Sequence, residues 1–429
     1  MLSEHTYVGF PRDKQNENMK KPHLLAIWLD GFRTDYLRKD WTPYLYQLAN
    51  NSITGEYRPP LAFTGIGVSI LTGVNPLKHR IWTEFIYEPN RSPYKWTATM
   101  AKLAKFVDVT TDHAGDKAKL ARIGTAHLIF KLSNHISHST YTPIAHMVPL
   151  SILPFFNVTI SKDIFQEDFL PFMTLPEIMK RFLIPFRILS ESRMKDPQII
   201  EEAFRINRND RLSIIQLGHL DHVGHTCGPN SGSISEALSK MDNLICAMVK
   251  KYEEFFNLDI FIFSDHGMVN VKRTVDPLRD LRNAKIKTNE YLAFFDSTLA
   301  RFWAFTKNAE ERLLTHLGET CGGKILSRED YTQYQIPSER RYGDIIWLAE
   351  PGTLILPNYY QGSSMNFGMH GYSPEAWEQC SPFIIRSSGR NARSVEHKAT
   401  PMDIYATILD LLQLPIPSNT EGQSLLFVR

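Results

Sequence analysis

Three short apolar runs in this chain stop abruptly at an acidic residue, and this pattern constrains the fold more than any other. Runs of this length without polar residues are typical of strands that are buried on both faces in a parallel sheet. Open α/β sheets bind their ligands at the carboxyl ends of the strands, so the acidic residues mark a candidate site. The runs are 23–29 before Asp30, 212–220 before Asp221, and 260–264 before Asp265.

The segment between the second and third runs predicts a helix, because apolar residues recur at three- and four-residue steps over 234–255. Ser233 and Glu236 predict a capping box at its start. Strand, helix and strand in this order indicate a βαβ unit of a mostly parallel sheet. Further helices are expected from Pro43, a favoured first helical residue, and over 400–412. We therefore predict an α/β fold with a three-layer α/β/α core.

Two stretches interrupt this alternation of strands and helices. The longer one is rich in Phe, Pro and His, and the shorter one contains a probable hairpin over 291–305 and a helix over 309–317. We predict a single α/β domain over 1–429 into which both stretches are inserted. The predicted core is 22–84, 197–271 and 343–429, the cap is 85–196, and the smaller insert is 272–342.

The charge balance argues against a general nucleic-acid binder, because 48 Lys and Arg face 46 Asp and Glu without a long block of either sign. Four scattered cysteines do not form a disulfide framework.

Residues 1–21 lack the apolar run of a secretory signal, so a cytoplasmic location is expected. The most apolar window, 147–160, is too short to span a bilayer, and two prolines break it, so no membrane span is expected.

Carboxylates and imidazoles follow the predicted strands, and one hydroxyl belongs to the same candidate set. Oxygen and imidazole nitrogen ligands together suit Zn²⁺, and Mn²⁺ is possible where carboxylates dominate. A single pair such as Asp221 and His225 is more often a capping Asp and a surface His, so the argument depends on the whole set. The set comprises Asp30, Thr64, Asp221, His225, Asp265, His266 and His370.

The motifs around these residues resemble the alkaline phosphatase superfamily, and within it the nucleotide pyrophosphatase/phosphodiesterase branch. The resemblance covers about 23–79 and 212 to the end, but not the cap. It implies a two-zinc site and a covalent phospho-threonine intermediate that water hydrolyses. It also implies one zinc held by Asp221, His225 and His370, and another held by Asp30, Asp265, His266 and the nucleophile Thr64.

The nucleophile motif departs from the family pattern by one residue. The family nucleophile lies nine residues before the Thr of a Leu-Thr-Gly triplet, here Thr72, but that position is Phe63, which has no nucleophilic atom. Thr64 lies eight residues before, and we favour it over Ser69. Gly65 and the glycine two residues later open a short helix whose free N–H groups can bind a phosphate oxygen.

Two further positions differ from the branch. Gly67 stands where an Asn often contacts a phosphate oxygen, and Arg80 follows Pro76–His79 where the family often has Gly. Arg80 is either an added phosphate contact or a solvated surface residue. Gly65 and Arg80 are the predicted substrate contacts.

The expected activity is that of a metal-dependent phosphodiesterase or pyrophosphatase whose substrate specificity is determined by the cap. The substrate would be a small phosphate ester, phosphoanhydride or phosphonate. Three alternatives remain open on the same residues: a phosphomonoesterase or phosphonate hydrolase, a phosphotransferase or mutase, and a metal-binding pseudoenzyme.

Overall fold

A seven-stranded sheet forms the centre of the computed structural model, which describes residues 20–62, 64–99, 116–396 and 399–427. The strand order is β17-β2-β16-β7-β1-β6-β5. Strand β1 pairs in parallel with both β6 and β7, β5 pairs in parallel with β6, and β16 runs antiparallel to β7 and β2. The strands are β1 (Lys21–Leu29), β2 (Ile53–Tyr57), β5 (Phe186–Leu189), β6 (Leu212–Leu217), β7 (Phe256–Phe263), β16 (Ser381–Arg386) and β17 (Arg393–Ser394).

Helices cover both faces of this sheet, which confirms the three-layer α/β/α core. The side chains of β1 alternate between two apolar clusters: Leu24, Ala26 and Trp28 pack on one face, and the residues between them pack on the other. Helices α2, α6 and α13 cover the first face, and α1, α7, α8 and α9 cover the second. Their bounds are α1 (Pro43–Asn50), α2 (Gly65–Thr72), α6 (Leu175–Arg181), α7 (Asp196–Phe204), α8 (His219–Cys227), α9 (Gly232–Phe255) and α13 (Met402–Leu411).

The βαβ unit is present, with β6 and β7 on either side of β1 and α9 between them along the chain. The predicted capping box of Ser233 and Glu236 is wrong. The N-cap of α9 is Ser231, whose hydroxyl accepts a hydrogen bond from the amide of Ile234 at 3.3 Å. The helix therefore begins earlier than the capping box predicted, because an earlier serine satisfies its free amides.

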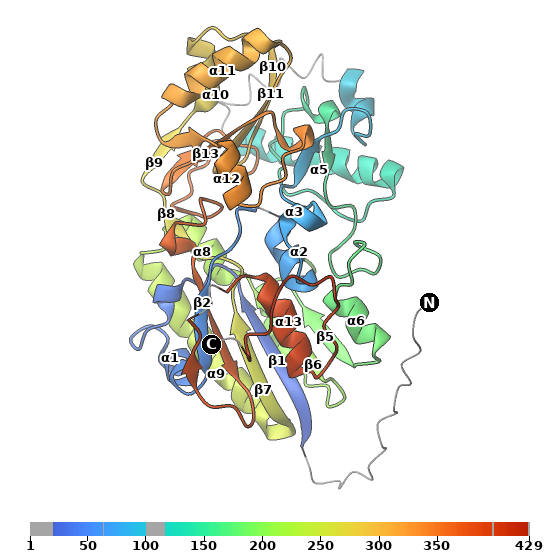
Figure 1. Ribbon diagram of the computed structural model, residues 1–429, viewed down its shortest axis with the longest axis vertical. Coiled ribbons are helices and arrows are strands. Elements are labelled where there is room, and N and C mark those ends of the chain that lie inside the picture. The colour runs from blue at the N-terminus through green and yellow to red at the C-terminus, as the bar shows by residue number, and fades with distance from the viewer. Residues whose placement is uncertain (1–19, 63, 100–115, 397–398, 428–429) are drawn as a thin grey trace.

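A second, four-stranded sheet in the order β10-β11-β13-β12 lies beyond one end of the main sheet (Figure 1). The hairpin of β10 (Tyr291–Phe295) and β11 (Leu299–Ala304) and the helix α11 (Lys307–Glu319) confirm the elements predicted there. The predicted return to the core at residue 343 is wrong. Strand β13 (Ile345–Ala349) pairs with β11 in the second sheet, where Ile345, Trp347 and Ala349 pack in the apolar cluster of that sheet.

The remaining elements of this second region are short. They are β8 (Val269–Asn270), β9 (Arg273–Val275), α10 (Pro277–Asn283), β12 (Gly323–Ile325), α12 (Arg328–Gln333), β14 (Thr353–Ile355) and β15 (Gly368–Met369), with 3-10 turns η4 (Arg340–Tyr342) and η5 (Trp377–Gln379). Strands β9 and β14 pair in parallel, and β8 and β15 pair antiparallel.

The predicted cap contains two different parts. Strand β5 lies within 85–196 yet joins the main sheet beside β6, so the boundary predicted at residue 196 is wrong. The preceding part contributes α5 (Asp116–Ser137) and the antiparallel pair of β3 (Phe85–Tyr87) and β4 (Phe156–Val158). The 3-10 turns η1 (Thr34–Tyr36), η2 (Lys95–Thr97) and η3 (Leu153–Phe155) and the helix α3 (Pro76–His79) complete the description.

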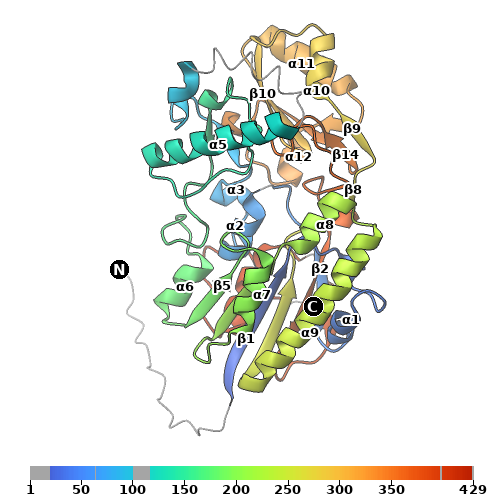
Figure 2. The same cartoon turned by 180° about the vertical axis from the view of Figure 1, so that it is seen from behind.

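The first part of the cap and the smaller insert share one aromatic core and together form the upper lobe of Figure 1. Phe85 and Phe156 come from the cap, and Phe294 and Trp303 come from the second sheet; the rings of Phe156 and Phe294 are 5.0 Å apart. The parallel strands of the main sheet point their carboxyl ends toward this lobe (Figures 1 and 2). None of the described helices is long and apolar enough to cross a membrane.

Candidate metal centre

Six of the seven predicted ligand residues lie together at the carboxyl edge of the main sheet. Asp30 directly follows β1, while Asp265 and His266 follow β7 after one residue, and His370 follows β15. Asp221 is not at a strand end as predicted: β6 ends at Leu217, and Asp221 lies in the first turn of α8 with His225 one turn later.

The carboxylate of Asp196 explains this early helix. It accepts hydrogen bonds from the amides of Gly218 at 3.2 Å and His219 at 2.9 Å, and so satisfies amides at the start of α8. On a helix, Asp221 and His225 are four residues apart and therefore share a face. Their Oδ2 and Nε2 atoms are 3.3 Å apart.

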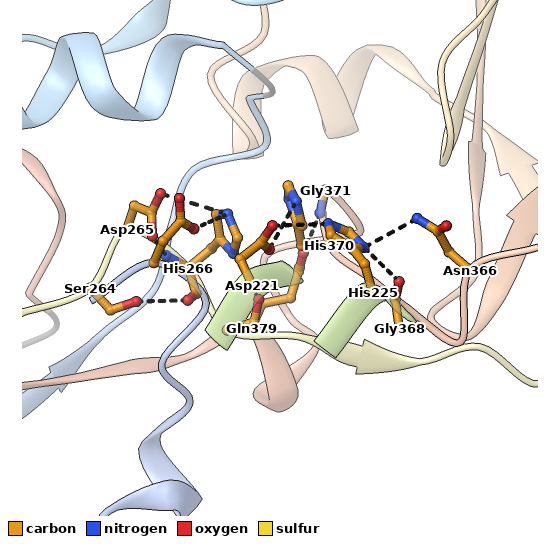
Figure 3. Close-up of polar contacts among 12 residues, drawn as sticks. Asp221, His225, Ser264, Asp265, His266, Asn366, Gly368, His370, Gly371 and Gln379 are labelled. Carbon is orange, nitrogen blue, oxygen red and sulfur yellow. Dashed lines mark hydrogen bonds and ion pairs between the residues drawn. The ribbon is translucent and has the colours of Figure 1, made fainter. Parts of the chain in front are cut away.

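The ligand atoms form two groups, each with all its atoms within 4.8 Å of one another. One group is Asp221, His266 and His370, and the other is Asp30, Asp265 and His266. His266 lies between them, with its Nε2 3.4 Å from Asp30 Oδ1 and 3.6 Å from Asp265 Oδ2. Its ring stacks on that of His370 at 3.7 Å (Figure 3). The three residues of the second group were all predicted to hold the same zinc. The first group contains two of the three residues predicted for the other zinc, with His266 in place of His225.

Backbone carbonyls orient two of the imidazoles. The Nδ1 atom of His225 is 2.8 Å from the carbonyl oxygen of Gly368, and Nδ1 of His266 is 2.8 Å from that of Gly267 (Figure 3). In the neutral tautomer that donates from Nδ1 to these carbonyls, Nε2 of each ring is available to a metal. Gly31 is also required here, because its φ is +72° and a Cβ would lie 3.1 Å from the Cα atom of Asp221.

Several buried oxygens of this site have no hydrogen-bond partner among the described residues. They are Oδ1 of Asp30, Oδ1 of Asp221 and Oγ1 of Thr64. Burying polar atoms without partners is costly, and a divalent cation between these oxygens and the imidazoles would satisfy them. The donor set therefore fits a metal such as zinc on the chemistry of the residues themselves.

The crowding of like charges also fits a bound cation. Burial, together with the carboxylates of Asp265 and Asp221, raises the pKa of Asp30 well above its usual range. Burial would raise the pKa of Asp221 as well, but the imidazoles of His225 and His370 hold it below its usual value. Burial and the neighbouring His266 lower the pKa of His370. The cluster thus favours unprotonated His370 and ionised Asp221, the forms that bind metal.

Thr64 lies at the amino end of α2 as its N-cap, and its side chain makes no capping hydrogen bond. A Cβ at Gly65 would lie 2.1 Å from the carbonyl oxygen of Ile81, so only glycine fits beside this segment. The rival hydroxyl of Ser69 is fully buried within α2 and lies 3.1 Å from His79 Nε2. Of the two hydroxyls, only that of Thr64 is without a partner in the described structure.

Arg80 ends α3 with a φ of +67° and forms an ion pair with Glu339. Its side chain is 53% exposed. A contact with phosphate would require Arg80 to leave this partner.

Glu191 is a site residue that the sequence reasoning missed. Its carboxylate contributes to the raised pKa of Asp30, and its Oε1 is 3.4 Å from Nε2 of Gln216. Glu191 follows β5, whose short apolar run over 186–189 contains Arg187. An apolar run followed by an acidic residue is present here too, but the charged side chain of Arg187 interrupts the run, so the pattern is hard to recognise.

Comparison with known proteins identifies the family. The model of the type I phosphodiesterase / nucleotide pyrophosphatase family matches residues 24–373. The chain belongs to this family. The match includes the whole cap, which the sequence motifs did not cover.

Individual members of the type I phosphodiesterase / nucleotide pyrophosphatase family are distant from this chain. An uncharacterized pyrophosphatase/phosphodiesterase of Schizosaccharomyces pombe is 24% identical over 265 residues, which are 58% of this chain and 46% of that protein. The chain thus spans about half the length of this curated relative.

Two solved structures have the same fold. Human ectonucleotide pyrophosphatase/phosphodiesterase 5 superposes with a TM-score of 0.66 at 16% identity, covering 94% of this chain and 97% of that one. An inactive form of the murine protein in complex with AMP gives 0.64 at 16% identity, covering 92% and 96%.

Proposed function

We propose that this chain is a metal-dependent phosphodiesterase or nucleotide pyrophosphatase that acts through Thr64. The observation that carries the proposal is the pair of ligand groups that share His266. In these groups, one carboxylate oxygen each of Asp30 and Asp221 is buried without a hydrogen-bond partner in the described structure. Paired sites of this kind bind two divalent cations that handle phosphoryl groups. Family membership supports the general reaction.

The chain offers ligands for two ions. Asp221, His225 and His370 would hold one ion; Asp30, Asp265, His266 and Thr64 would hold the other. Zinc suits this mixture of oxygen and nitrogen, and manganese is the alternative. When bound, such cations supply the positive charge that stabilises a deprotonated hydroxyl and the negative phosphoryl oxygens.

The remaining chemistry belongs to the chain itself. The Oγ1 atom of Thr64 attacks phosphorus and forms an O–P bond, while the bond to the leaving oxygen breaks. The free amides at the amino end of α2, from Gly65 to Gly67, can hold a phosphoryl oxygen during this step. Water then attacks the phospho-threonine, which releases phosphate monoester and restores the hydroxyl. Arg80 would assist only after leaving Glu339.

A turnover screen on zinc-loaded and manganese-loaded protein tests the proposal. Because a related murine protein binds AMP, nucleotide diesters and dinucleotides are tested first, with bis-p-nitrophenyl phosphate as a small activated diester and p-nitrophenyl phosphate as its monoester control. We expect the diester to be preferred. A preference for monoesters or phosphonates would favour the first alternative, and transfer to an added alcohol would favour a transferase. Two bound metals without any turnover would indicate a pseudoenzyme.

A further inference from the structure

Helix α5 of the upper lobe is apolar on two opposite sides. On the inner side, Ala126, Ile129 and Phe130 are buried in the aromatic core of the lobe. On the outer side, four large aliphatic side chains recur at four- and eight-residue steps, which spreads them over about 160° of the helix circumference, with the last three within about 80°. These are Leu120, Leu128, Leu132 and Ile136, with exposed fractions of 67%, 59%, 46% and 61%.

This outer face is unusual for a protein in water. Single exposed apolar residues are common, but a contiguous row along one helix normally marks a surface that something covers. Figure 2 shows α5 running across the outside of the upper lobe, away from the main sheet. The described part of the chain therefore covers only the inner side of the helix.

The charges around α5 indicate the kind of partner. From Lys117 to Lys162 the sequence has lysine, arginine and histidine but no aspartate or glutamate, although the chain as a whole is nearly neutral. Lys131, His127 and His135 are exposed on α5 itself. An exposed apolar row flanked by basic residues is the pattern of helices that lie in the surface of an anionic bilayer.

We propose that the outer face of α5 binds the surface of an anionic lipid bilayer. Leu128 and its aliphatic neighbours would enter the boundary between headgroups and acyl chains, with Lys131 at the headgroups. A second copy of this chain suits the face less well, because a symmetric contact would bring Lys131 of one copy toward Lys131 of the other. The proposal does not depend on the catalytic activity.

Cosedimentation of the whole protein with vesicles tests this proposal. We expect binding to vesicles of phosphatidylcholine mixed with phosphatidylserine, little binding to phosphatidylcholine alone, and weaker binding as salt screens the charges. The double variant Leu128→Glu/Leu132→Glu should bind the mixed vesicles about a hundredfold more weakly, since each leucine contributes roughly tenfold. Lys131→Glu should weaken binding to the mixed vesicles by about tenfold.

The matched control is Leu314→Glu, which changes an exposed helical leucine of α11, 40% exposed, and should bind as the native protein does. All variants should hydrolyse a small diester at the native rate, which shows that they fold. If the double variant does not fold, Ile136→Gln replaces it. The proposal is overturned if the native protein does not bind the mixed vesicles. It is also overturned if the double variant binds them as tightly as the native protein does. A native dimer that the double variant dissociates overturns it too, because the face would then be an interface between copies.

Discussion

Two hydroxyls compete for the role of nucleophile, and their surroundings separate them. Ser69 lies against His79 inside α2, whereas Oγ1 of Thr64 is buried without a described partner at the amino end of the helix. A nucleophile must have a free lone pair directed at its substrate, and this condition favours Thr64.

Replacing Thr64 by Ala should therefore lower kcat by about a thousandfold or more, because only electrostatic stabilisation remains once the covalent route is lost. Thr64→Ser should keep a substantial part of the activity. The metal content, measured by elemental analysis, should stay near two ions per chain in Thr64→Ser. A Ser69→Ala variant serves as the matched control; if it is inactive while Thr64→Ala is active, the assignment of the nucleophile is wrong.

His23, at the far end of β1 from the metal centre, gives a prediction about stability. Burial lowers its pKa to about 4, although its Nδ1 lies 2.8 Å from the carbonyl oxygen of Asp210. The unfolded chain, with a pKa near 6.5, binds the proton more tightly, so stability should fall as the pH decreases from about 6.5 to 4. The expected loss is about 3 kcal/mol.

Urea unfolding at a series of pH values measures this loss. The His23→Asn variant should be less stable at neutral pH, because its stacking on Phe256 is lost, but its stability should vary less between pH 6.5 and 4. A variant curve parallel to the native one would show that His23 does not titrate in this range.

The residues of the site could be predicted from the sequence where they directly follow a long apolar strand or belong to a motif. Asp30, Asp265 and His370 are of this kind. Glu191 could not, because Arg187 interrupts the apolar run before it. Asp221 was found by its motif, but its position on a helix depends on the distant Asp196, which the sequence does not relate to it.

At the scale of elements, the amino end of α2 is held by a close backbone contact. The chain segment at Ile81 passes so near Gly65 that a methyl group there would overlap its carbonyl oxygen. The position of Thr64 thus depends on the absence of a side chain at the next residue.

Gly65→Ala should displace either α2 or the segment around Ile81 and lower kcat/KM by at least about a hundredfold, since small misplacements of a nucleophile are costly. Unfolding should also require less urea. The control is Gly124→Ala on α5, where a Cβ would meet no atom within 4 Å. This variant should be unchanged or more stable by up to about 1 kcal/mol, because alanine favours the helix. If Gly65→Ala and Gly124→Ala were equally active, the close contact between Gly65 and Ile81 would not determine the position of Thr64.

Element types could be predicted more reliably than element boundaries. The helix over 232–255 was recognised by its apolar period, but its start was misplaced because Ser231 and Ser233 are both good N-cap residues. Strand β5 was missed because Arg187 interrupts its four-residue apolar run, which leaves neither a continuous nor an alternating pattern.

At the scale of the whole molecule, one buried arginine joins the second sheet to the segment where the chain leaves the core. Arg301 of β11 donates from Nε to Asp296 Oδ2 at 3.0 Å, and from Nη1 to Thr83 Oγ1 at 3.0 Å and the carbonyl oxygen of Phe85 at 2.7 Å. Thr83 and Phe85 lie where the chain leaves the core for the cap. The guanidinium thus connects both inserts to the core.

Arg301→Met should lower the free energy of unfolding by about 3–5 kcal/mol, because it leaves the buried carboxylate of Asp296 unpaired. Adding Asp296→Asn should restore part of this loss, as a double-mutant cycle in urea would show. The exposed pair of Arg273 and Glu350 provides the control, and Arg273→Met should change stability by less than about 1 kcal/mol. A similar effect of both substitutions would mean that the buried pair of Arg301 and Asp296 contributes no more to stability than the exposed pair.

The shared aromatic core of the upper lobe has a consequence for the synthesis of this chain. Phe85 and Phe156 leave the ribosome long before Phe294 and Trp303, the rings that they pack against. At roughly 5–20 residues per second, the earlier half of the lobe waits for about 7–28 seconds while the strands of the main sheet are being made. Phe85 can pack on Tyr94 and Phe130 during this time, but the surface that meets the second sheet is uncovered, so the nascent protein should depend on chaperones that bind this half until residue 303 has been translated.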